Sequence, residues 1–480
     1  MPKRTVFEMA LDNTHLGYEK ISAMIGASPK RIFFAGVGGV SMSSLAKVCV
    51  MRGHDVTGYD RAESDLTRKI SEEGVKVVYE SLPEYADGSD IIVYTVAMSA
   101  DDPVVKRARE LGKPLISRAD FLGYIMKDYP VRIGVSGMHG KSTTTAITAS
   151  VFEAGGREPT VFGGARMKKT GECNIIGGGD CFVFEACEYM GSFLDFYPTL
   201  PVVLNIDMDH PDYFSSMDMI IDHFAAFMKK SDRAVVNGDD IEVAEAVRRA
   251  GVAPITFGRS PTCDYTLGNV AISPRSSSFD ILFRGEFLTH AEIKVPGEHI
   301  ALDALAAAAA GHASGISPEA IGRGLSSYAG INRRMEFVGK TARGADVYDD
   351  YAHHPTELNA TLKTAGRMGY EKLFVVFQPH TFSRTKELFD EFAYVLAGSL
   401  AEKTVLAPIY PARETNVYGV TSDGLAAAVK NRGADAVSAG SLAEAAEMIE
   451  EIAGDGDCVV VAGAGDIDCL PAMLTEKAEK

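Results

Sequence analysis

Short apolar runs that end at glycine or acidic residues alternate with longer helical patterns along nearly the whole chain. The first run, Arg31–Ala35, leads into the glycine turn at 36–39 and then into a helix rich in alanine and leucine. The next run, His54–Tyr59, ends at Asp60. Because this alternation is typical of βαβ units with parallel sheets, the sequence predicts an α/β fold that opens with a Rossmann-like unit.

Two boundaries divide the 480 residues, a length that exceeds what one hydrophobic core usually organises. Asp128-Tyr129-Pro130 precedes a fresh run at Val131–Val135, and the residue before a proline disfavours helix. Another unit opens near Arg333, and turn-rich, strand-like segments between 258 and 294 predict an antiparallel excursion. We expect three α/β domains: a Rossmann-like domain at 1–130, a central P-loop ATPase-type domain at 131–332 and a Rossmann-like domain at 333–480.

The most informative segment, Val131–Thr145, is predicted to form a strand, a glycine turn and the start of a helix. It contains the short GxxGK[ST] form of a phosphate loop, because Val135 stands where the full motif has glycine. Backbone N–H groups and the helix N-terminus can surround a phosphate, Lys141 can reach the β and γ oxygens, and Ser142 can coordinate Mg²⁺. The pattern alone is equally compatible with a structural glycine turn. The loop residues expected to bind ATP are Gly137, Met138, His139, Gly140, Lys141, Ser142 and Thr143.

Metal-ligand candidates follow two further strand-like runs. Glu185 ends the run that begins at Cys181, and His210 follows the run Val202–Asn205. The carboxyl ends of parallel strands lie at the edge that carries the phosphate loop, where oxygen ligands can hold Mg²⁺. We therefore expect Glu185 and His210 to serve the metal, although each taken alone is equally well explained as a helix-capping or hydrogen-bonded loop residue.

Composition excludes several other classes of protein. With 48 Lys and Arg against 65 Asp and Glu, a net charge of −17 disfavours binding to nucleic acid. The seven cysteines are scattered without a CxxC pair, which predicts reduced thiols. The amino terminus lacks the apolar core of a signal peptide, and Ala304–Ala310 is too short to span a bilayer. We expect a cytoplasmic protein without membrane insertion.

Five motifs, in the order GMHGKSTTT, FEACEYMGSFL, NIDMDHPDYF, YDDYAHHPTE and FQPHTFSRT, resemble those of the Mur ligase family, in particular the branch that joins L-alanine to UDP-N-acetylmuramate. The resemblance runs from Ile32 to about Asp466. It implies domains for the UDP-sugar, for ATP, and for the amino acid and nucleotide, in that order. It also implies that the lactyl carboxylate attacks the γ-phosphate of ATP and that L-alanine attacks the acyl phosphate, a cytoplasmic step of peptidoglycan precursor synthesis. We expect a monomer or weak dimer.

The resemblance also implies roles for individual residues. Catalysis is expected of Lys141, Glu185, His210, His353 and Arg384, with ATP and Mg²⁺ as cofactors; Ser142 and Glu185 would bind one Mg²⁺ and His210 a second. Further ATP contacts are expected from His299, Asp303, Arg334 and Asp350. Tyr351, His353 and Arg384 are expected on the amino-acid side, where an arginine fork matches a carboxylate. The UDP-sugar contacts are expected to be Gly36, Gly38, Gly39, Met42, Ser43 and Asp60.

Three positions depart from the family pattern and keep open the possibility of a non-catalytic paralogue. Ser41 stands where the family usually has a further glycine, and Ile300 and Asp303 stand where it has asparagines near the adenine. Ala225 replaces the modified lysine of several relatives, which is consistent with the L-alanine branch. The alternatives are a ligase that attaches a preformed peptide to the same sugar nucleotide, a non-catalytic paralogue that binds the UDP-sugar, and a Rossmann dehydrogenase, which leaves the central phosphate loop unexplained.

Overall fold

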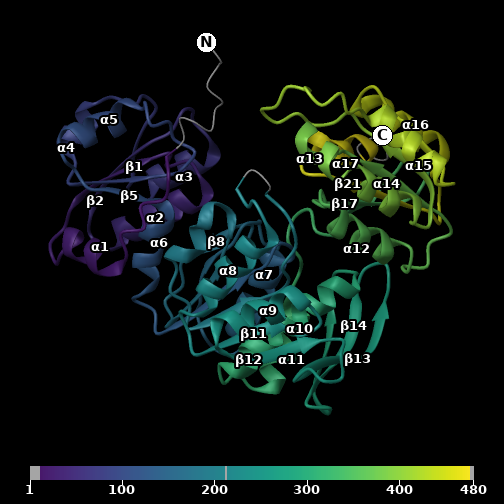
Figure 1. The fold of residues 1–480 in the computed structure, drawn as a ribbon, viewed down its shortest axis with the longest axis horizontal. Helices are drawn as coiled ribbons and strands as arrows, with labels where there is room; N and C mark the ends of the chain where they lie inside the picture. Colours follow the sequence, from purple (N-terminus) through teal and green to yellow (C-terminus); the bar gives the residue numbers. More distant parts are fainter. Residues whose placement is uncertain (1–10, 211–212, 476–480) are drawn as a thin grey trace. The chain divides into compact units, whose positions relative to one another are not determined.

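The computed structural model describes residues 11–210 and 213–475, and internal contacts group them into two units (Figure 1). The first unit contains residues 11–166, 172–264 and 306–321, and the second contains residues 167–171, 265–305 and 322–475. The α/β class predicted from the sequence is confirmed. No helix within these described ranges is long and apolar enough to cross a membrane.

The first unit begins with a five-stranded parallel sheet in the order β3-β2-β1-β4-β5. Its strands are β1 (Arg31–Ala35), β2 (Asp55–Tyr59), β3 (Lys76–Val78), β4 (Ile91–Tyr94) and β5 (Leu115–Ser117). Its helices are α1 (Tyr18–Ile25), α2 (Val40–Met51), α3 (Asp65–Glu72), α4 (Glu84–Gly88), α5 (Pro103–Glu110) and α6 (Arg118–Met126).

Successive side chains of β1 point to opposite faces of this sheet, and both faces are covered. Ile32 and Phe34 pack into a core with residues of α2 and α6, whereas Phe33 and Ala35 pack into a second core with residues of α4 and α5. Helices therefore cover both faces, as the picture shows for α4 and α5 opposite α2 (Figure 1). Burial on both sides explains the continuous apolar run that predicted this strand.

The rest of the first unit is built on strands in the order β12-β11-β10-β6-β9-β7-β8, parallel except for the β7–β8 pair. These strands are β6 (Val131–Ser136), β7 (Thr160–Phe162), β8 (Asn174–Ile175), β9 (Cys181–Glu185), β10 (Leu200–Val203), β11 (Arg233–Asn237) and β12 (Ala253–Gly258). The accompanying helices are α7 (Lys141–Ala154), the 3₁₀ helix η2 (Tyr189–Asp195), α8 (Met217–Met228) and α9 (Ile241–Ala250). Because β6 lies between β9 and β10, the loops that follow these three strands meet at one edge.

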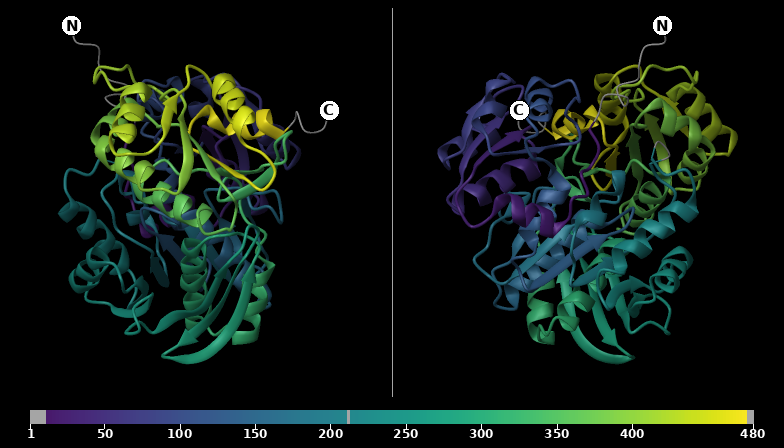
Figure 2. Two further views of the ribbon diagram at one scale, coloured as in Figure 1. Left: turned by 90° about the vertical axis from the view of Figure 1, so that its right-hand side faces the viewer. Right: turned by 60° about the vertical axis from the view of Figure 1, so that its left-hand side comes forward.

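The predicted antiparallel excursion is present in the second unit as two consecutive hairpins, which form a curved sheet (Figure 2). Its strands are β13 (Tyr265–Ile272), β14 (Ser277–Phe283) and β15 (Glu286–Ile293). Helix α10 (Glu298–Ala313) follows, and then α11 (Pro318–Ser327).

The carboxy-terminal part of the second unit is a six-stranded sheet in the order β16-β17-β21-β18-β19-β20, with only the β16–β17 pair antiparallel among these strands. Its strands are β16 (Glu336–Lys340), β17 (Asp346–Asp350), β18 (Leu373–Phe377), β19 (Ala401–Leu406), β20 (Ala436–Ser438) and β21 (Cys458–Ala462). Its helices are α12 (Pro355–Ala365), α13 (Phe382–Glu387), α14 (Phe389–Ala397), α15 (Ser422–Asn431), α16 (Leu442–Ile452), the 3₁₀ helix η3 (Asp466–Cys469) and α17 (Leu470–Thr475). The ends of β17 and β18 carry the residues that the sequence predicts for the amino acid.

Candidate active site

The loop between β6 and α7 has the backbone that a phosphate loop requires. Gly140 immediately precedes α7 with φ 85°, and Gly137 has φ 142°, two conformations that L side chains rarely adopt. A Cβ on Gly137 would lie 3.0 Å from the Leu204 Cβ and 3.2 Å from the Asn205 backbone nitrogen. Glycine is therefore needed at Gly137 for close packing as well as for backbone conformation.

Lys141, the first residue of α7, is held by its own loop and by one carboxylate. Its Nζ donates to the carbonyl oxygens of Gly137 at 2.6 Å and Met138 at 3.1 Å, and forms an ion pair with the Glu188 Oε2 at 2.9 Å. Burial by itself lowers the pKa of Lys141, but Glu188 and the neighbouring Glu185 outweigh burial and raise it well above its usual range. The ammonium is therefore permanently charged at neutral pH.

Ser142 and Glu185, the two predicted magnesium ligands with oxygen donors, lie side by side. The Ser142 Oγ donates to the Glu185 Oε2 at 2.7 Å, and the Gly164 backbone nitrogen donates to the same oxygen at 2.8 Å. A Cβ on Gly164 would lie 2.5 Å from that oxygen, so glycine permits this approach. A hydroxyl and a carboxylate together are the hard oxygen donors that suit Mg²⁺.

His210, the third predicted ligand, lies close to the same cluster. Its Nε2 is 3.5 Å from the Glu188 Oε1, its ring centroid is 4.7 Å from that of Tyr189, and its backbone has φ 53°. The positive φ of a non-glycine residue marks a position held by its surroundings. Glu188 thus joins Lys141 to His210.

Sequence reasoning did not single out Glu188 or Asn205. The Asn205 Oδ1 accepts from the His139 backbone nitrogen at 2.9 Å, and its Nδ2 donates to the His139 carbonyl at 3.0 Å, so one amide side chain holds both backbone polar groups of His139. The His139 Nε2 lies 3.4 Å from Asp207. Their position in the sequence could have identified them, because Glu188 and Asn205 also follow the carboxyl ends of strands.

The predicted sugar loop after β1 is organised by Asp60. The Asp60 Oδ2 accepts from the Gly38 backbone nitrogen at 2.7 Å, and a Cβ on Gly38 would lie 2.6 Å from that oxygen. Met42 and Ser43 are 2% and 1% exposed and belong to the core, so their contacts with the sugar nucleotide stay predictions. Ser41 lies inside α2 and is not one of the residues with positive φ, so the loop does not require glycine there for its conformation.

In the second unit, the residues that follow β17 divide into buried and accessible groups. The Asp350 carboxylate is buried and accepts from the backbone nitrogens of Met335 at 2.7 Å and Ala352 at 2.9 Å. The Tyr351 ring is 37% exposed, and the Arg334 guanidinium lies 5.4 Å from its centroid. Asp350 therefore shapes the turn that presents Tyr351, and its assignment to ATP stays a prediction.

His353 and His354 have different environments. The His354 side chain caps α12 by accepting from the Thr356 backbone nitrogen. The His353 Nδ1 lies 3.0 Å from the Tyr351 carbonyl oxygen. Because a carbonyl oxygen only accepts, Nδ1 of the neutral ring carries the proton and Nε2 is the acceptor.

His380 and Arg384 follow β18 and lie near His353. The ring centroids of His353 and His380 are 6.0 Å apart, and His380 stacks on Tyr410 at 5.5 Å. Burial and Arg384 lower the pKa of His380, which favours the neutral ring. Glu414 holds the first turn of α13 by accepting from the Ser383 backbone nitrogen at 2.9 Å and from its hydroxyl.

The start of α10 carries Ile300 and Asp303, two of the three departures from the family pattern. The His299 Nδ1 lies 3.3 Å from the Thr364 hydroxyl oxygen, and the Ile300 side chain is 2% exposed. Asp303 is partly buried on the same helix. The Ile300 side chain is therefore part of the core, and the contacts of His299 and Asp303 with ATP stay predictions.

An α/β fold with a lysine-bearing phosphate loop, a hydroxyl–carboxylate pair and a histidine at one sheet edge defines an enzyme of phosphoryl transfer from a nucleotide. Three family descriptions match the chain in order: Mur ligase family, catalytic domain, over 31–130; Mur ligase middle domain over 135–311; and Mur ligase, glutamate ligase domain, over 333–465. The chain belongs to the Mur ligase family and has its three-domain architecture.

Relatives and solved structures cover nearly the whole chain. UDP-N-acetylmuramate–L-alanine ligases of Caldicellulosiruptor saccharolyticus and Acetivibrio thermocellus are 38% and 37% identical over 94% of this chain and over 99% and 96% of their own. The crystal structure of the UDP-N-acetylmuramate–alanine ligase of Thermotoga maritima matches with a TM-score of 0.77 at 26% identity, covering 94% of this chain and 99% of that one. The murein peptide ligase of Psychrobacter arcticus matches with a TM-score of 0.61 at 21% identity over 93% of this chain and 98% of its own, a likeness of fold alone.

Proposed function

We propose that this protein joins L-alanine to the lactyl carboxylate of UDP-N-acetylmuramate with cleavage of ATP to ADP and phosphate, a cytoplasmic step of peptidoglycan precursor synthesis. A carboxylate oxygen attacks the γ-phosphorus and ADP leaves, giving an acyl phosphate. The amine of L-alanine then attacks the acyl carbon, phosphate leaves and the nitrogen loses a proton.

The observation that carries the proposal is the cluster at the phosphate loop. Lys141, Ser142 and Glu185 lie at one sheet edge, and the buried Glu188 connects Lys141 with His210. Phosphoryl transfer depends mainly on positioning and charge neutralisation. A protein that only binds a UDP-sugar has no need of these groups, so the cluster argues against the non-catalytic paralogue.

The donor set at the loop also fits Mg²⁺. The Ser142 hydroxyl and Glu185 carboxylate oxygens are 2.7 Å apart and would hold one ion, and His210 would hold a second. Bound Mg²⁺ neutralises the charge that develops on the transferring phosphate. Lys141 places its own positive charge on the β and γ oxygens once it leaves the carbonyls of its loop.

The residues after β17 and β18 are assigned to the amino acid. Arg384 presents a guanidinium fork to the carboxylate of L-alanine, and Tyr351 lines the approach. Nδ1 of His353 faces the Tyr351 carbonyl and the Glu357 carboxylate, so that the ring in its neutral form offers Nε2 as an acceptor for the proton of the attacking amine. Further contacts to ATP are assigned to His299, Asp303, Arg334 and Asp350, and the UDP-sugar to Gly36, Gly38, Gly39, Met42, Ser43 and Asp60.

The named relatives favour L-alanine over a preformed peptide. The alanine ligases are 37–38% identical to this chain over 94% of its length, whereas the murein peptide ligase shares only the fold at 21% identity. A peptide-adding ligase uses the same activation chemistry, so the second substrate must be tested directly.

The test is phosphate release from ATP and Mg²⁺ with UDP-N-acetylmuramate, with L-alanine, with a tripeptide, or with neither. We expect release only with L-alanine, and loss of release in Lys141→Ala. Release with the tripeptide alone would assign the peptide-adding reaction. Binding of UDP-N-acetylmuramate without release under any condition would identify a non-catalytic paralogue.

A further inference from the structure

Arg118, the first residue of α6, is a partly buried arginine without a carboxylate partner. No hydrogen bond or ion pair of its guanidinium occurs within residues 11–210 and 213–475. Burial lowers the pKa of the guanidinium, which nevertheless stays charged at neutral pH. A charge that loses water without gaining a partner destabilises the folded chain. A role in ligand binding explains such a residue better than a role in stability.

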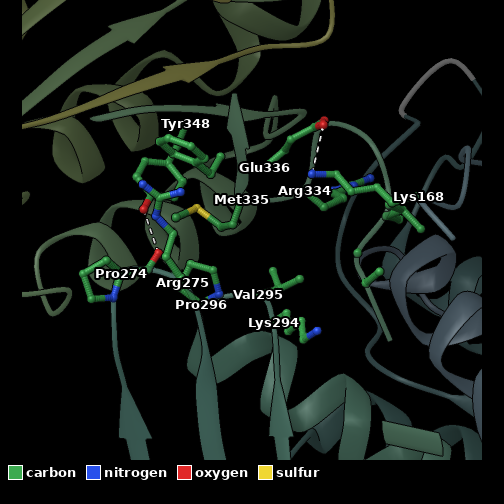
Figure 3. Close-up of a pocket in the computed structure, with 14 residues that line it drawn as sticks. Lys168, Pro274, Arg275, Lys294, Val295, Pro296, Arg334, Met335, Glu336 and Tyr348 are labelled. Carbon is green, nitrogen blue, oxygen red and sulfur yellow. Dashed lines mark hydrogen bonds and ion pairs between the residues drawn. The ribbon is translucent and has the colours of Figure 1, made fainter. Parts of the chain in front are cut away.

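Two lysines show how the chain pairs other enclosed cations. The Lys168 ammonium, beside a cavity of the second unit, forms an ion pair with Glu336 at 3.1 Å (Figure 3). In the first unit, the Lys141 ammonium forms an ion pair with Glu188 at 2.9 Å. Arg118 lacks a comparable carboxylate, so its charge is available to an anion from solution.

Arg118 lies at the edge of the first sheet that carries the predicted sugar loop. It directly follows β5, which pairs in parallel with β4, and β4 pairs in parallel with β1. The sugar loop begins after β1 at Gly36, and a Cβ there would lie 2.7 Å from the Cγ2 of Thr95, which follows β4. Ligands of such sheets bind outside the carboxyl ends of the strands. Arg118 is therefore positioned to contact a ligand of the sugar loop.

Arg118 also lies near the segment that carries the reacting groups. Its helix α6 packs against η2, and a Cβ on Gly123 would overlap the Asp195 carbonyl oxygen. The Cys187 thiol and the Asp195 carboxylate both act electrostatically on the Arg118 guanidinium. Cys187 acts in the same way on Lys141, the lysine of the phosphate loop. Arg118 thus has the sugar loop on one side and the phosphate-loop cluster on the other.

The carboxylates of this region are engaged with other groups. The Asp195 Oδ1 lies 2.7 Å from the His15 Nδ1, and no ion pair joins Asp195 to Arg118 in the part of the chain that the structure describes. Glu185 accepts from the Ser142 hydroxyl, and Glu188 pairs with the phosphate-loop lysine. None of these carboxylates therefore neutralises the arginine.

The backbone that carries Arg118 is fixed before any ligand binds. The Ser117 Oγ accepts from the Asp120 backbone nitrogen at 3.4 Å, which caps α6. The Asp120 carboxylate accepts from the Thr14 hydroxyl at 2.8 Å and from the Gly17 backbone nitrogen at 3.1 Å. A preformed position reduces the entropy that is lost when a ligand binds.

We infer that Arg118 binds the lactyl carboxylate of the sugar nucleotide, with its guanidinium fork on the carboxylate oxygens. The assignment rests on the proposed function, which requires that carboxylate to lie between the sugar loop and the γ-phosphate of ATP. The backbone N–H groups of the sugar loop are suited to the diphosphate, so the carboxylate is the anion that needs a further cation. A guanidinium at this point holds the nucleophile in position and reduces its repulsion from the γ-phosphate.

Isothermal titration without ATP or Mg²⁺ tests the assignment, with UDP-N-acetylmuramate and UDP-N-acetylglucosamine as separate probes. The second probe has the same nucleotide and acetylated sugar but lacks the lactyl carboxylate. Arg118→Met removes the charge and keeps an unbranched side chain, and Arg109→Met, at an exposed arginine of α5, is the matched control. We expect Arg118→Met to bind UDP-N-acetylmuramate at least about tenfold more weakly than Arg109→Met does, and the two variants to bind UDP-N-acetylglucosamine equally.

Two results would overturn the assignment. One is equal affinity of Arg118→Met and Arg109→Met for UDP-N-acetylmuramate, and the other is an equal loss with both probes, which would place Arg118 on the diphosphate. Failure of the native chain to bind UDP-N-acetylmuramate would instead contradict the proposed function itself.

Urea unfolding of the variants separates a binding role from a structural one. Removal of an unpaired charge leaves no partner behind, so the urea midpoint of Arg118→Met should equal or exceed that of the native chain. Arg118→Lys keeps the charge without the fork and provides the same comparison in a more conservative variant. Its affinity for UDP-N-acetylmuramate should lie between those of the native chain and Arg118→Met, and native affinity for that probe in Arg118→Lys would show that no fork is needed and overturn the bidentate contact.

Discussion

Lys141 and Glu188 form an ion pair beneath the phosphate loop, with 2.9 Å between Nζ and Oε2 and side-chain exposures of 12% and 1%. Burial alone would raise the pKa of Glu188, but Lys141 and the hydrogen bond from His210 outweigh burial and lower it. Both groups are therefore ionised, and each removes the cost of burying the other. The pair keeps a charged lysine at the point where a phosphate is expected.

Replacement of Glu188 by alanine should destabilise the protein. It leaves the Lys141 ammonium buried without its carboxylate, and breaking a buried ion pair costs about 3–5 kcal/mol. Urea unfolding of Glu188→Ala measures the loss, and Glu172→Ala, which removes an exposed partner of Lys69, serves as the matched control with a change below about 1 kcal/mol. Equal unfolding free energies of the two variants would show that the Lys141–Glu188 pair contributes nothing to stability.

Ser142→Ala should increase the concentration of Mg²⁺ needed for half-maximal phosphate release by at least about tenfold, because one oxygen ligand and the hydrogen bond to Glu185 are lost. Ser142→Thr keeps the hydroxyl and should restore most of the Mg²⁺ dependence. Ser150→Ala, on the same helix, removes only a hydroxyl bonded to the Ala146 carbonyl and should behave like the native chain. If the Mg²⁺ requirement of Ser142→Ala equals that of Ser150→Ala, Ser142 is not a ligand.

Asp349 makes stability depend on pH. Burial raises the pKa of Asp349 to about 7, and its ion pair with Arg333 at 3.1 Å does not compensate. The folded-state pKa lies above the unfolded value of about 4, so the folded state holds the proton more tightly. The contribution of Asp349 to the free energy of unfolding is therefore full below pH 4 and is lost as pH rises to about 7. Asp349→Asn should abolish the part of the pH-dependent fall in the free energy of unfolding that Asp349 causes.

The measurement is the urea midpoint of the native chain and of Asp349→Asn between pH 4 and 8. The stability of the native chain relative to the variant should fall through this range and level off above about pH 7. A constant difference between the two proteins would mean that Asp349 does not titrate there.

Glu414 is expected to position Arg384 through the first turn of α13. Glu414→Ala removes both hydrogen bonds to Ser383 and should raise the KM for L-alanine by about tenfold, with a smaller effect on the KM for ATP. Because Glu414 also raises the pKa of His380, the acidic limb of the pH–rate profile should move to lower pH if that limb reports His380.

Glu414→Gln keeps an oxygen that accepts from the Ser383 backbone nitrogen, so its KM for L-alanine should lie close to that of the native chain. Arg413→Ala, on the exposed neighbour, is the control. Arg384→Ala tests the assignment on which this prediction rests, so an unchanged KM in that variant refutes the amino-acid site, whereas an unchanged KM in Glu414→Ala alone refutes only the positioning role.

Much of the fold was predictable because its determinants are local. The strands β1, β18 and β21 lie where continuous apolar runs occur, and burial on both faces of a parallel sheet requires such runs. Gly137 and Gly140 were identifiable because few other residues adopt their positive φ. The motifs that resemble those of the Mur ligases lie at strand ends, because the loops after parallel strands converge at one edge of the sheet.

The tertiary structure decided which of several similar side chains meet. Glu185 and Glu188 lie three residues apart in one acidic stretch, and only the path of the chain after β9 turns Glu185 to Ser142 and Glu188 to Lys141. The adjacent Asp349 and Asp350 are the same residue type but have different partners. Asp349 pairs with Arg333 and Asp350 accepts from the Met335 backbone nitrogen, because strand register and burial place the two side chains differently. The sequence by itself determined the α/β class, the phosphate loop and the candidate chemistry, because these follow from periodicity and residue type. Contacts such as Tyr348 with Pro274, which group residues 265–305 with 322–475, join segments distant in the chain, and no local pattern encodes them.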